Sequence, residues 1–382
     1  MGAPADIPYK IIDNSASLRG LAKTLEHAKA IGVDLEADSL YHFKEKVCLI
    51  QLATGNVNAV IDPLVIEDVS VLKPIFKQRD SQKVFHGSDY DIRSLFRDFR
   101  ITVDNMFDTE LASRFLGFKE TSLEAVLKNK FNISLDKKYQ RKDWSKRPLP
   151  EEMIAYAVKD VGFLVPLAEQ LKAELREKGR LYWVYEECKY LSKVRPNTAD
   201  SNPLYIYFKG AGKLNSRSLA VLEALLQYRR NLAQKKDKPL FRIISSRSLM
   251  DLAEKKPVSI KQLEKTNALS PKLIGMYGQG VIDAIKCAMK LPSDVLPVYP
   301  RKKAPIVSVA VAKRVRALRQ WRDSQAKKLT IDPALILTKS LISTLAFQRP
   351  LNLRHLSKIK ELRRWQVEEF GNDILTLIKS AP

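Results

Sequence analysis

Short apolar runs alternate with amphipathic stretches over the first half of the chain. The apolar spacing over residues 17–30 is helical. Four runs have the length and composition of buried strands, and they cover residues 10–13, 31–36, 47–53 and 59–61. Helical and strand-like segments then alternate to about residue 190. This order predicts an α/β domain over residues 1–200, in which helices cover a mixed sheet.

The second half of the chain repeats itself at an offset of 93 residues. The matching segments are 226–229 with 319–322, 256–260 with 349–353, and 285–286 with 378–379. A repeat of this length indicates a duplicated domain rather than a solenoid unit. Both copies show short amphipathic helices, so we predict two small all-α domains at 210–290 and 307–382. Four prolines predict a linker over 291–306.

Candidate chemistry comes from four dispersed carboxylates and one phenol. Asp34 and Glu36 end an apolar strand at alternate positions, so both side chains project from one face. Tyr156 and Asp160 lie one helical turn apart on the same helix face. Asp91 lies near a predicted helix start. Hard divalent cations require clustered oxygen ligands, so this set predicts a two-metal phosphodiesterase site.

Each of these signals also has an ordinary structural interpretation. Asp34 and Glu36 could line a solvated strand exit, and Asp91 could be an acid in the first turn of a helix capped by Ser88 or Asp89. Asp160 could be a surface acid. Tyr156 could be a core aromatic residue. Only the order and spacing of the set favour the metal site.

Residues 9–190 resemble the DEDD family of 3′-5′ exonucleases, in the branch with a tyrosine in its third motif, and in particular its ribonuclease D members. The other runs that carry the similarity are 46–53, 83–87, 107–110 and 139–149. The first helical copy resembles the HRDC domain at 228–230, 238–243 and 248–249, and the second copy resembles it more loosely. The resemblance implies a ribonuclease H-like exonuclease domain followed by two HRDC-like domains.

The resemblance also implies roles for the acidic residues. Asp34 would bridge two Mg²⁺ or Mn²⁺ ions, Glu36 and Asp160 would complete the ion on the nucleophile side, and Asp91 would support the second ion. Tyr156 would orient the attacking water. Asp89 is an alternative ligand if the second motif is read in the other register.

The expected activity is 3′-to-5′ hydrolysis of RNA with release of nucleoside 5′-monophosphates, in the 3′ maturation of tRNA precursors. The expected partner is RNA with a single-stranded 3′ end, with no obligate protein partner. Two alternatives remain: a related exonuclease that acts mainly on DNA, and an inactive, basic RNA-binding protein. Residues near the motifs that could contact the terminal nucleotide are Tyr41, Phe43, His86, Tyr139, Arg141 and Trp144.

Charge is distributed unevenly along the chain. Residues 1–200 contain 31 Lys and Arg against 30 Asp and Glu, whereas residues 201–382 contain 35 against 13. A basic excess over a long folded region favours polyanion binding. Three widely spaced cysteines argue against a disulfide framework, and the N-terminus lacks a signal-peptide pattern. No apolar run is long enough to span a membrane, so we expect a cytoplasmic protein.

Overall fold

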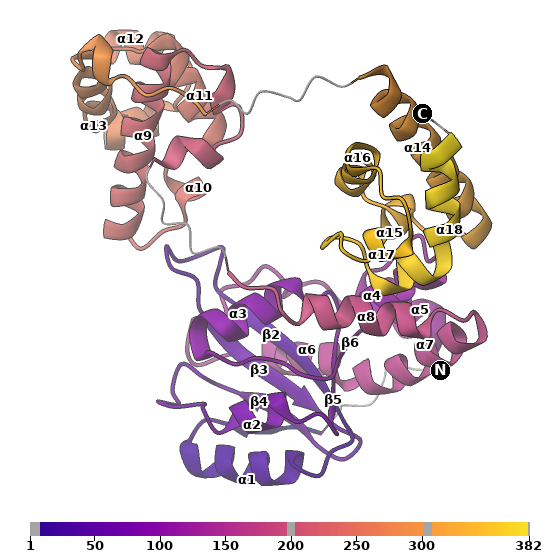
Figure 1. Cartoon of the computed structure of the whole chain (residues 1–382). Helices are drawn as coiled ribbons and strands as arrows, with labels where there is room; N and C mark the ends of the chain where they lie inside the picture. The colour runs from indigo at the N-terminus through magenta and orange to yellow at the C-terminus, as the bar shows by residue number, and fades with distance from the viewer. Residues whose placement is uncertain (1–7, 197–202, 301–307, 381–382) are drawn as a thin grey trace. The chain divides into compact units, whose positions relative to one another are not determined.

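The computed structural model describes residues 8–196, 203–300 and 308–380, which fall into two compact units (Figure 1). The first unit contains residues 1–37, 47–196 and 306–382. The second contains residues 38–46 and 197–305. The α/β domain and the second helical domain therefore share a unit. The first helical domain forms the other unit, together with a short segment of the α/β domain.

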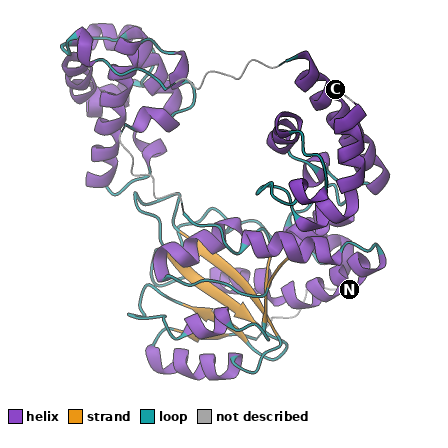
Figure 2. Ribbon diagram, viewed as in Figure 1, coloured by secondary structure: helices purple, strands orange, loops and turns teal. Residues whose placement is uncertain are grey.

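A six-stranded mixed sheet forms the centre of the α/β domain (Figure 2). The strands are β1 (Lys10–Ile12), β2 (Ala30–Ala37), β3 (Val47–Ala53), β4 (Asn58–Ile61), β5 (Gln82–Phe85) and β6 (Met106–Asp108). Their order in the sheet is β1-β4-β3-β2-β5-β6. The pairs β2–β3 and β3–β4 are antiparallel, and the other three pairs are parallel. The prediction of a mixed sheet is confirmed, and β2 lies inside it.

Eight helices belong to the described part of this domain. They are α1 (Ser15–Leu25), α2 (Leu72–Lys77), α3 (Asp89–Phe99), α4 (Thr109–Leu116), α5 (Leu123–Phe131), α6 (Glu151–Gly162), α7 (Leu164–Glu177) and α8 (Leu181–Leu191). The Asn14 side chain caps α1 by accepting a hydrogen bond from the Ser17 amide. Helix α6 packs against β2, β3 and β4, and α7 packs against β2 and β5.

The two helical domains have the same order of five helices. The first has α9 (Ser216–Lys235), α10 (Leu240–Ile243), α11 (Ser246–Lys255), α12 (Ile260–Lys265) and α13 (Pro271–Met289). The second has α14 (Val309–Leu329), α15 (Pro333–Ile336), α16 (Lys339–Gln348), α17 (Leu353–Leu356) and α18 (Arg364–Ser380). Among the described residues, three short 3₁₀ helices lie at Leu204–Tyr207, Ala211–Lys213 and Ser293–Val295. Every α-helix of the second copy begins 93 residues after its counterpart.

The repeated arginine of each copy has the same structural role. Arg229 in α9 is buried and donates to the carbonyl oxygen of Ile244, and Arg322 in α14 is buried and donates to that of Leu337. Both pairs are related by the offset of 93 residues. Each guanidinium therefore supplies a hydrogen bond to a backbone carbonyl group at the end of the second helix of its domain. These arginines are structural residues of the repeat.

The second helical domain shares a hydrophobic core with the α/β domain. Trp365 of α18 stacks on Trp183 of α8, with ring centroids 4.6 Å apart, and meets Phe115 edge-on. Its indole Nε1 donates to Glu187, and its backbone amide donates to Glu186. Buried aromatic contacts of this kind contribute strongly to an interface. Packing therefore joins the second helical domain to helix α8.

The segment 38–46, which connects β2 to β3, packs on the first helical domain. The Asp237 carboxylate lies 2.7 Å from His42 Nδ1 and accepts a hydrogen bond from the Phe43 amide. The Arg242 guanidinium lies over the Tyr41 ring, 4.6 Å from its centroid. No helix within the described ranges is long and apolar enough to cross a membrane.

Candidate active site

Strand β2 presents Asp34 and Glu36 on one face, because alternate residues of a strand point the same way. Opposite them on β3 lie Gln51 and Leu49, respectively. The pairing with β3 shifts register between Glu36 and Ala37, at the end of the strand. Glu36 therefore occupies the last regularly paired position before the chain leaves the sheet for segment 38–46.

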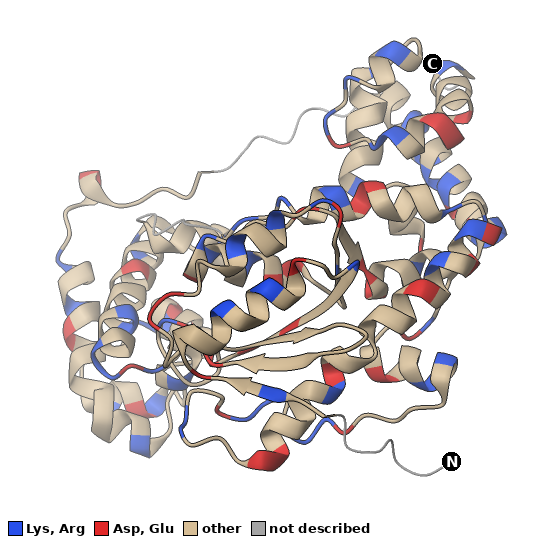
Figure 3. Cartoon of the chain, turned by 90° about the horizontal axis from the view of Figure 1, so that it is seen from below, with Lys and Arg blue, Asp and Glu red and all other residues tan. Residues whose placement is uncertain are grey.

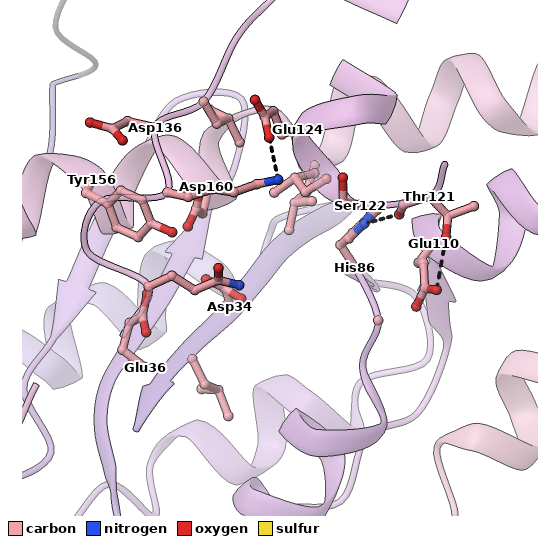
Figure 4. A pocket seen from close by; sticks show the side chains of 17 residues that line it. Asp34, Glu36, His86, Glu110, Thr121, Ser122, Glu124, Asp136, Tyr156 and Asp160 are labelled. Carbon is pink, nitrogen blue, oxygen red and sulfur yellow. Dashed lines mark hydrogen bonds and ion pairs between the residues drawn. The ribbon is translucent and has the colours of Figure 1, made fainter. Parts of the chain in front are cut away.

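Helix α6 approaches β2 closely because position 32 is a glycine. A Cβ atom on Gly32 would lie 3.0 Å from the carbonyl oxygen of Val161 and 3.3 Å from the Leu164 Cβ. This contact places Asp160, the residue before Val161, opposite Asp34. One carboxylate oxygen from each of Asp34, Glu36 and Asp160 can be chosen so that all three lie within 4.8 Å of one another (Figure 4). The three acids come from two elements that are distant in sequence.

Asp91 lies on the first turn of α3 and is buried, and it is outside this group of three. Burial raises the pKa of both Glu36 and Asp91; the charge of Asp91 adds to the shift of Glu36, and the charge of Asp34 adds to the shift of Asp91. Asp89, the alternative ligand, instead forms an ion pair with Arg93 on an exposed face of α3. The structure thus separates the two aspartates, and only Asp91 faces the other acids.

The acidic cluster suppresses its own ionisation in the absence of cations. Burial, together with the charge of Asp34, raises the pKa of Asp160 to about 8. Burial also raises the pKa of Asp34 to about 6. For Glu36, burial and the charges of Asp34, Asp160 and Asp91 raise the pKa well above its usual value. Carboxylates that repel one another in this way gain most from a bound cation.

These residues fit divalent metal ions by their chemistry and by their position. All are hard oxygen donors, as Mg²⁺ and Mn²⁺ prefer. Asp34, Glu36 and Asp160 face a cavity of about 380 Å³, whose lining includes one cation, Lys137, which is already paired with Glu124. The described part of the pocket therefore offers the acids no side-chain counter-charge of their own. Divalent cations would supply it.

Tyr156 stands beside the acids and keeps its proton. It forms a hydrogen bond with Asp160, and burial together with the charges of Asp160, Glu36 and Asp34 raises the pKa of its hydroxyl. Tyr139 meets the Tyr156 ring edge-on with centroids 5.8 Å apart, and Tyr139 donates a hydrogen bond to Glu152. The phenol is thus held between a carboxylate and an aromatic neighbour.

The structure corrects the expectation for Trp144. Its ring is only 1% exposed and packs 6.2 Å from that of Tyr156, so it offers no face on which a base could stack. Its basic, exposed sequence neighbours gave no sign of this burial. Trp144 supports Tyr156 from within the protein. Arg141, in the same segment, is exposed and is not part of the pocket lining.

His86 lines the pocket, but both of its ring nitrogens already have partners. Nδ1 lies 2.9 Å from the Thr109 hydroxyl, and Nε2 donates to the carbonyl oxygen of Thr121 at 2.8 Å. Burial lowers the pKa of His86, which favours the neutral ring. Thr121 also donates from its hydroxyl to Glu110 (Figure 4). Sequence analysis did not identify Glu110 or Thr121 as pocket residues.

Tyr41 and Phe43 lie in segment 38–46, which packs with the first helical domain, and neither lines the pocket. Phe43 contacts the hydrophobic core of that domain. Their contact with a terminal nucleotide remains a prediction, as it does for Tyr139 and Arg141. The basic residues 301–303, which belong to the basic second half of the chain, lie outside the described residues.

Comparison with known proteins finds family models that match three segments of the chain. A family model described as 3′-5′ exonuclease matches residues 9–176, and one described as HRDC domain matches residues 218–285 and 311–378. "Protein RRP6-like 1" of Arabidopsis thaliana is 30% identical over 312 residues, which are 78% of this chain and 49% of that protein. The chain thus spans about half the length of this relative.

Other relatives match over most of their own length. "Ribonuclease D" of Acidiphilium cryptum (strain JF-5) is 29% identical over 370 residues, which are 96% of this chain and 92% of that protein. The crystal structure of Escherichia coli RNase D, "an exoribonuclease involved in structured RNA processing", aligns with a TM-score of 0.74 and 24% identity over 98% of this chain and 100% of that one. At this identity the structural likeness concerns the fold. The chain therefore carries a 3′-5′ exonuclease domain followed by two HRDC domains, and it is similar to a ribonuclease D over 96% of its length.

Proposed function

We propose that this chain hydrolyses the 3′-terminal phosphodiester bond of RNA with the help of two divalent metal ions, and that its substrates include tRNA precursors with a single-stranded 3′ end. The observation that carries the proposal is the convergence of Asp34, Glu36 and Asp160 in one pocket, beside Tyr156. The products would be nucleoside 5′-monophosphates.

Asp34, Glu36 and Asp160 would hold the metal ions, and Asp91 would support one of them from α3. When bound, the ions would lower the pKa of a water molecule and stabilise the charge that develops on the phosphate oxygens. Asp34 is the natural shared ligand, because it lies in one group with Glu36 and Asp160, and because its charge, added to the effect of burial, raises the pKa of Glu36, Asp91 and Asp160.

Tyr156 would act as a hydrogen-bonding group rather than as a base. Its raised pKa keeps the hydroxyl protonated at neutral pH, and its bond to Asp160 fixes the phenol at the edge of the acidic cluster. From this position the hydroxyl can orient a water molecule or a phosphate oxygen. Activation of the water would depend on the bound ions, since a protonated phenol takes up no proton.

The pocket suits one unstacked nucleotide better than a duplex end. Its volume of about 380 Å³ lies in the range of small-ligand sites, and it combines acidic residues with apolar ones such as Leu123, Leu135 and Leu164. A 3′-terminal nucleotide must leave its stack to enter such a site. This favours a single-stranded 3′ end as the substrate.

The direct test is an assay on 5′-labelled RNA with a single-stranded 3′ tail, in Mg²⁺, Mn²⁺ or EDTA. We expect a ladder of shortened RNA that requires a divalent ion and disappears in the Asp34→Asn variant. Asp89→Asn is the matched control, because Asp89 faces away from the cluster and pairs with Arg93. A tRNA precursor with a 3′ extension, compared with the mature tRNA, tests the substrate class.

Two results would contradict the proposal in different ways. Faster cleavage of a DNA strand of the same sequence would favour the DNA exonuclease. Binding of RNA without cleavage under every metal condition would favour the inactive RNA-binding protein, for which the basic residues 201–382 are the supporting observation.

A further inference from the structure

A second cavity, of about 740 Å³, lies between the exonuclease domain and the second HRDC domain, within the same compact unit. Its lining includes Arg114 of α4 and Lys119 from the exonuclease domain, and Lys327 of α14 from the HRDC domain. We call this cavity the α4–α14 groove. Thr121 lines both the groove and the catalytic pocket. The groove and the catalytic pocket therefore lie next to each other at Thr121.

The walls of the groove are held in place by a close backbone contact. A Cβ atom on Gly117 would lie 2.1 Å from the carbonyl oxygen of Thr330, so only glycine allows this approach. Gly117 also has a φ of +91°, which favours glycine. The stack of Trp183 on Trp365 fixes the same two domains to each other. The packing of the two domains therefore fixes the walls of the groove.

The cations of the groove have no acidic partner within the described part of the chain. Arg114, Lys119 and Lys327 form no ion pair among residues 8–196, 203–300 and 308–380. The two acids that line the groove are both engaged elsewhere, since Asp323 accepts from Arg322 and Asp332 accepts from the Ala334 amide. The groove therefore presents positive charge that is available to a ligand.

The wider charge distribution agrees with an anionic ligand. Residues 306–382 contain 15 Lys and Arg against 6 Asp and Glu. Lys and Arg are spread over many helices (Figure 3), so charge alone does not identify a contact surface. The α4–α14 groove stands out because cations from two domains, without acidic partners in the described ranges, converge on a cavity that shares Thr121 with the catalytic pocket.

We propose that the α4–α14 groove binds the phosphate backbone of the RNA strand upstream of the 3′-terminal nucleotide, through Lys119, Lys327 and Arg114. This proposal rests on the proposed function, because it assumes that a 3′ end occupies the catalytic pocket. The remainder of the strand must leave that pocket, and the route past Thr121 leads to the three cations. Phosphate contacts there would position the strand without selecting its sequence.

The test compares Lys119→Ala and Lys327→Ala with Lys328→Ala. Lys328 is the matched control, because it is exposed, its replacement removes the same charge, and it does not line the groove. Binding of a single-stranded RNA of about 20 nucleotides is measured in EDTA over a range of salt concentrations. Cleavage of the same RNA and of a dinucleotide is measured with Mg²⁺. Thermal melting checks that each variant is folded.

We expect Lys119→Ala and Lys327→Ala each to reduce the slope of log affinity against log salt by about 1, and Lys328→Ala to leave it unchanged. Both groove variants should raise KM for the long RNA and leave dinucleotide cleavage unaltered. Equal salt slopes for Lys327→Ala and Lys328→Ala would overturn the groove proposal. If the wild-type protein cleaved neither RNA, the proposed function would fail, while the binding slopes would still decide the groove proposal.

Discussion

Arg147 forms a two-point ion pair with Asp62, with Nη2 2.8 Å from Oδ1 and Nε 2.5 Å from Oδ2. Arg147 Nη2 also donates to the carbonyl oxygen of Cys48 in β3, and Nη1 donates to that of Trp144. The guanidinium thus joins the segment after residue 137 to the sheet. Because this segment carries Tyr139 and Trp144 against Tyr156, Arg147 is a positioning residue for the phenol.

Replacing Arg147 by Gln should therefore affect both stability and turnover. The substitution leaves Asp62 partly buried without its partner, so we expect a loss of about 1–3 kcal/mol in the free energy of unfolding. It should also lower kcat by about tenfold with a smaller change in KM, because Tyr156 loses its support. Urea unfolding and steady-state kinetics measure the two effects.

Lys146→Gln is the control for Arg147, since Lys146 is the exposed preceding residue. Arg147→Lys keeps the charge but not the two-point geometry, so it should restore only part of the activity. A loss of stability with kcat unchanged would show that Arg147 has a structural role only.

Replacing Tyr156 by Phe tests the phenol itself. The ring and its contacts with Tyr139 and Trp144 remain, so the melting temperature should change little. We expect kcat to fall by about 10²-fold or more, with KM nearly constant, because a hydrogen bond made in the transition state is lost. The hydrogen bond from Tyr156 lowers the pKa of Asp160, so its removal should raise the pH at which metal ions bind.

Isothermal titration calorimetry with Mg²⁺ at several pH values measures whether metal binding by Tyr156→Phe requires a higher pH. Tyr185→Phe is a suitable control, because Tyr185 lies on α8 against Phe107 and outside the pocket lining. Full activity of Tyr156→Phe would exclude a role for the hydroxyl and leave the residue as a packing element.

The strands and the separate acidic residues could be predicted from sequence because their signals are local. The apolar run 31–36 and the Asp-x-Glu at its end predict strand β2 and its polar face, and helical spacing places Tyr156 and Asp160 on one side of α6. Predicting the 93-residue duplication required only a comparison of the chain with itself. These features depend on residues that are near one another or repeated.

The contacts that assemble the site depend on residues far apart in sequence. Gly32 gave no sign that α6 would approach it, and nothing near Arg147 indicated Asp62 as its partner. Trp144 lies in a polar segment, yet it is buried. The hydrophobic pattern of α8 does not say whether Trp183 packs inside its own domain or on α18. Tertiary packing determines each of these outcomes.

Replacing Trp365 by Ala tests the packing of the second HRDC domain on the exonuclease domain. The variant removes the stack on Trp183 and the hydrogen bond to Glu187, so we expect the free energy of unfolding to fall by about 3–5 kcal/mol. Hydrogen exchange of the α8 amides should rise as its outer face becomes exposed. Trp321→Ala, in α14 of the same domain, should cost less because Trp321 is partly exposed. Unchanged protection of α8 would contradict the packing role.

Replacing Asp160 by Asn should make the metal-free protein more stable at high pH but not at low pH. Burial and the charge of Asp34 raise the pKa of Asp160 to about 8 from its usual value of 3.8. Between these values the folded state holds a proton that the unfolded state has lost, so stability falls as pH rises through this window. Below pH 3.8, Asp160 is protonated in both the folded and the unfolded state, so it does not lower the stability of the protein. The asparagine of the variant would carry no charge at any pH.

In EDTA, the difference in unfolding free energy between Asp160→Asn and the wild type should therefore grow between about pH 4 and about pH 8, by several kcal/mol in total. Mg²⁺ should reverse the difference at pH 8, because it stabilises only the protein that retains its ligands. Asp89→Asn should show neither effect, because Asp89 is exposed and paired with Arg93. A difference that is constant with pH would mean that Asp160 ionises freely in the folded protein, which would remove the electrostatic argument for a bound cation.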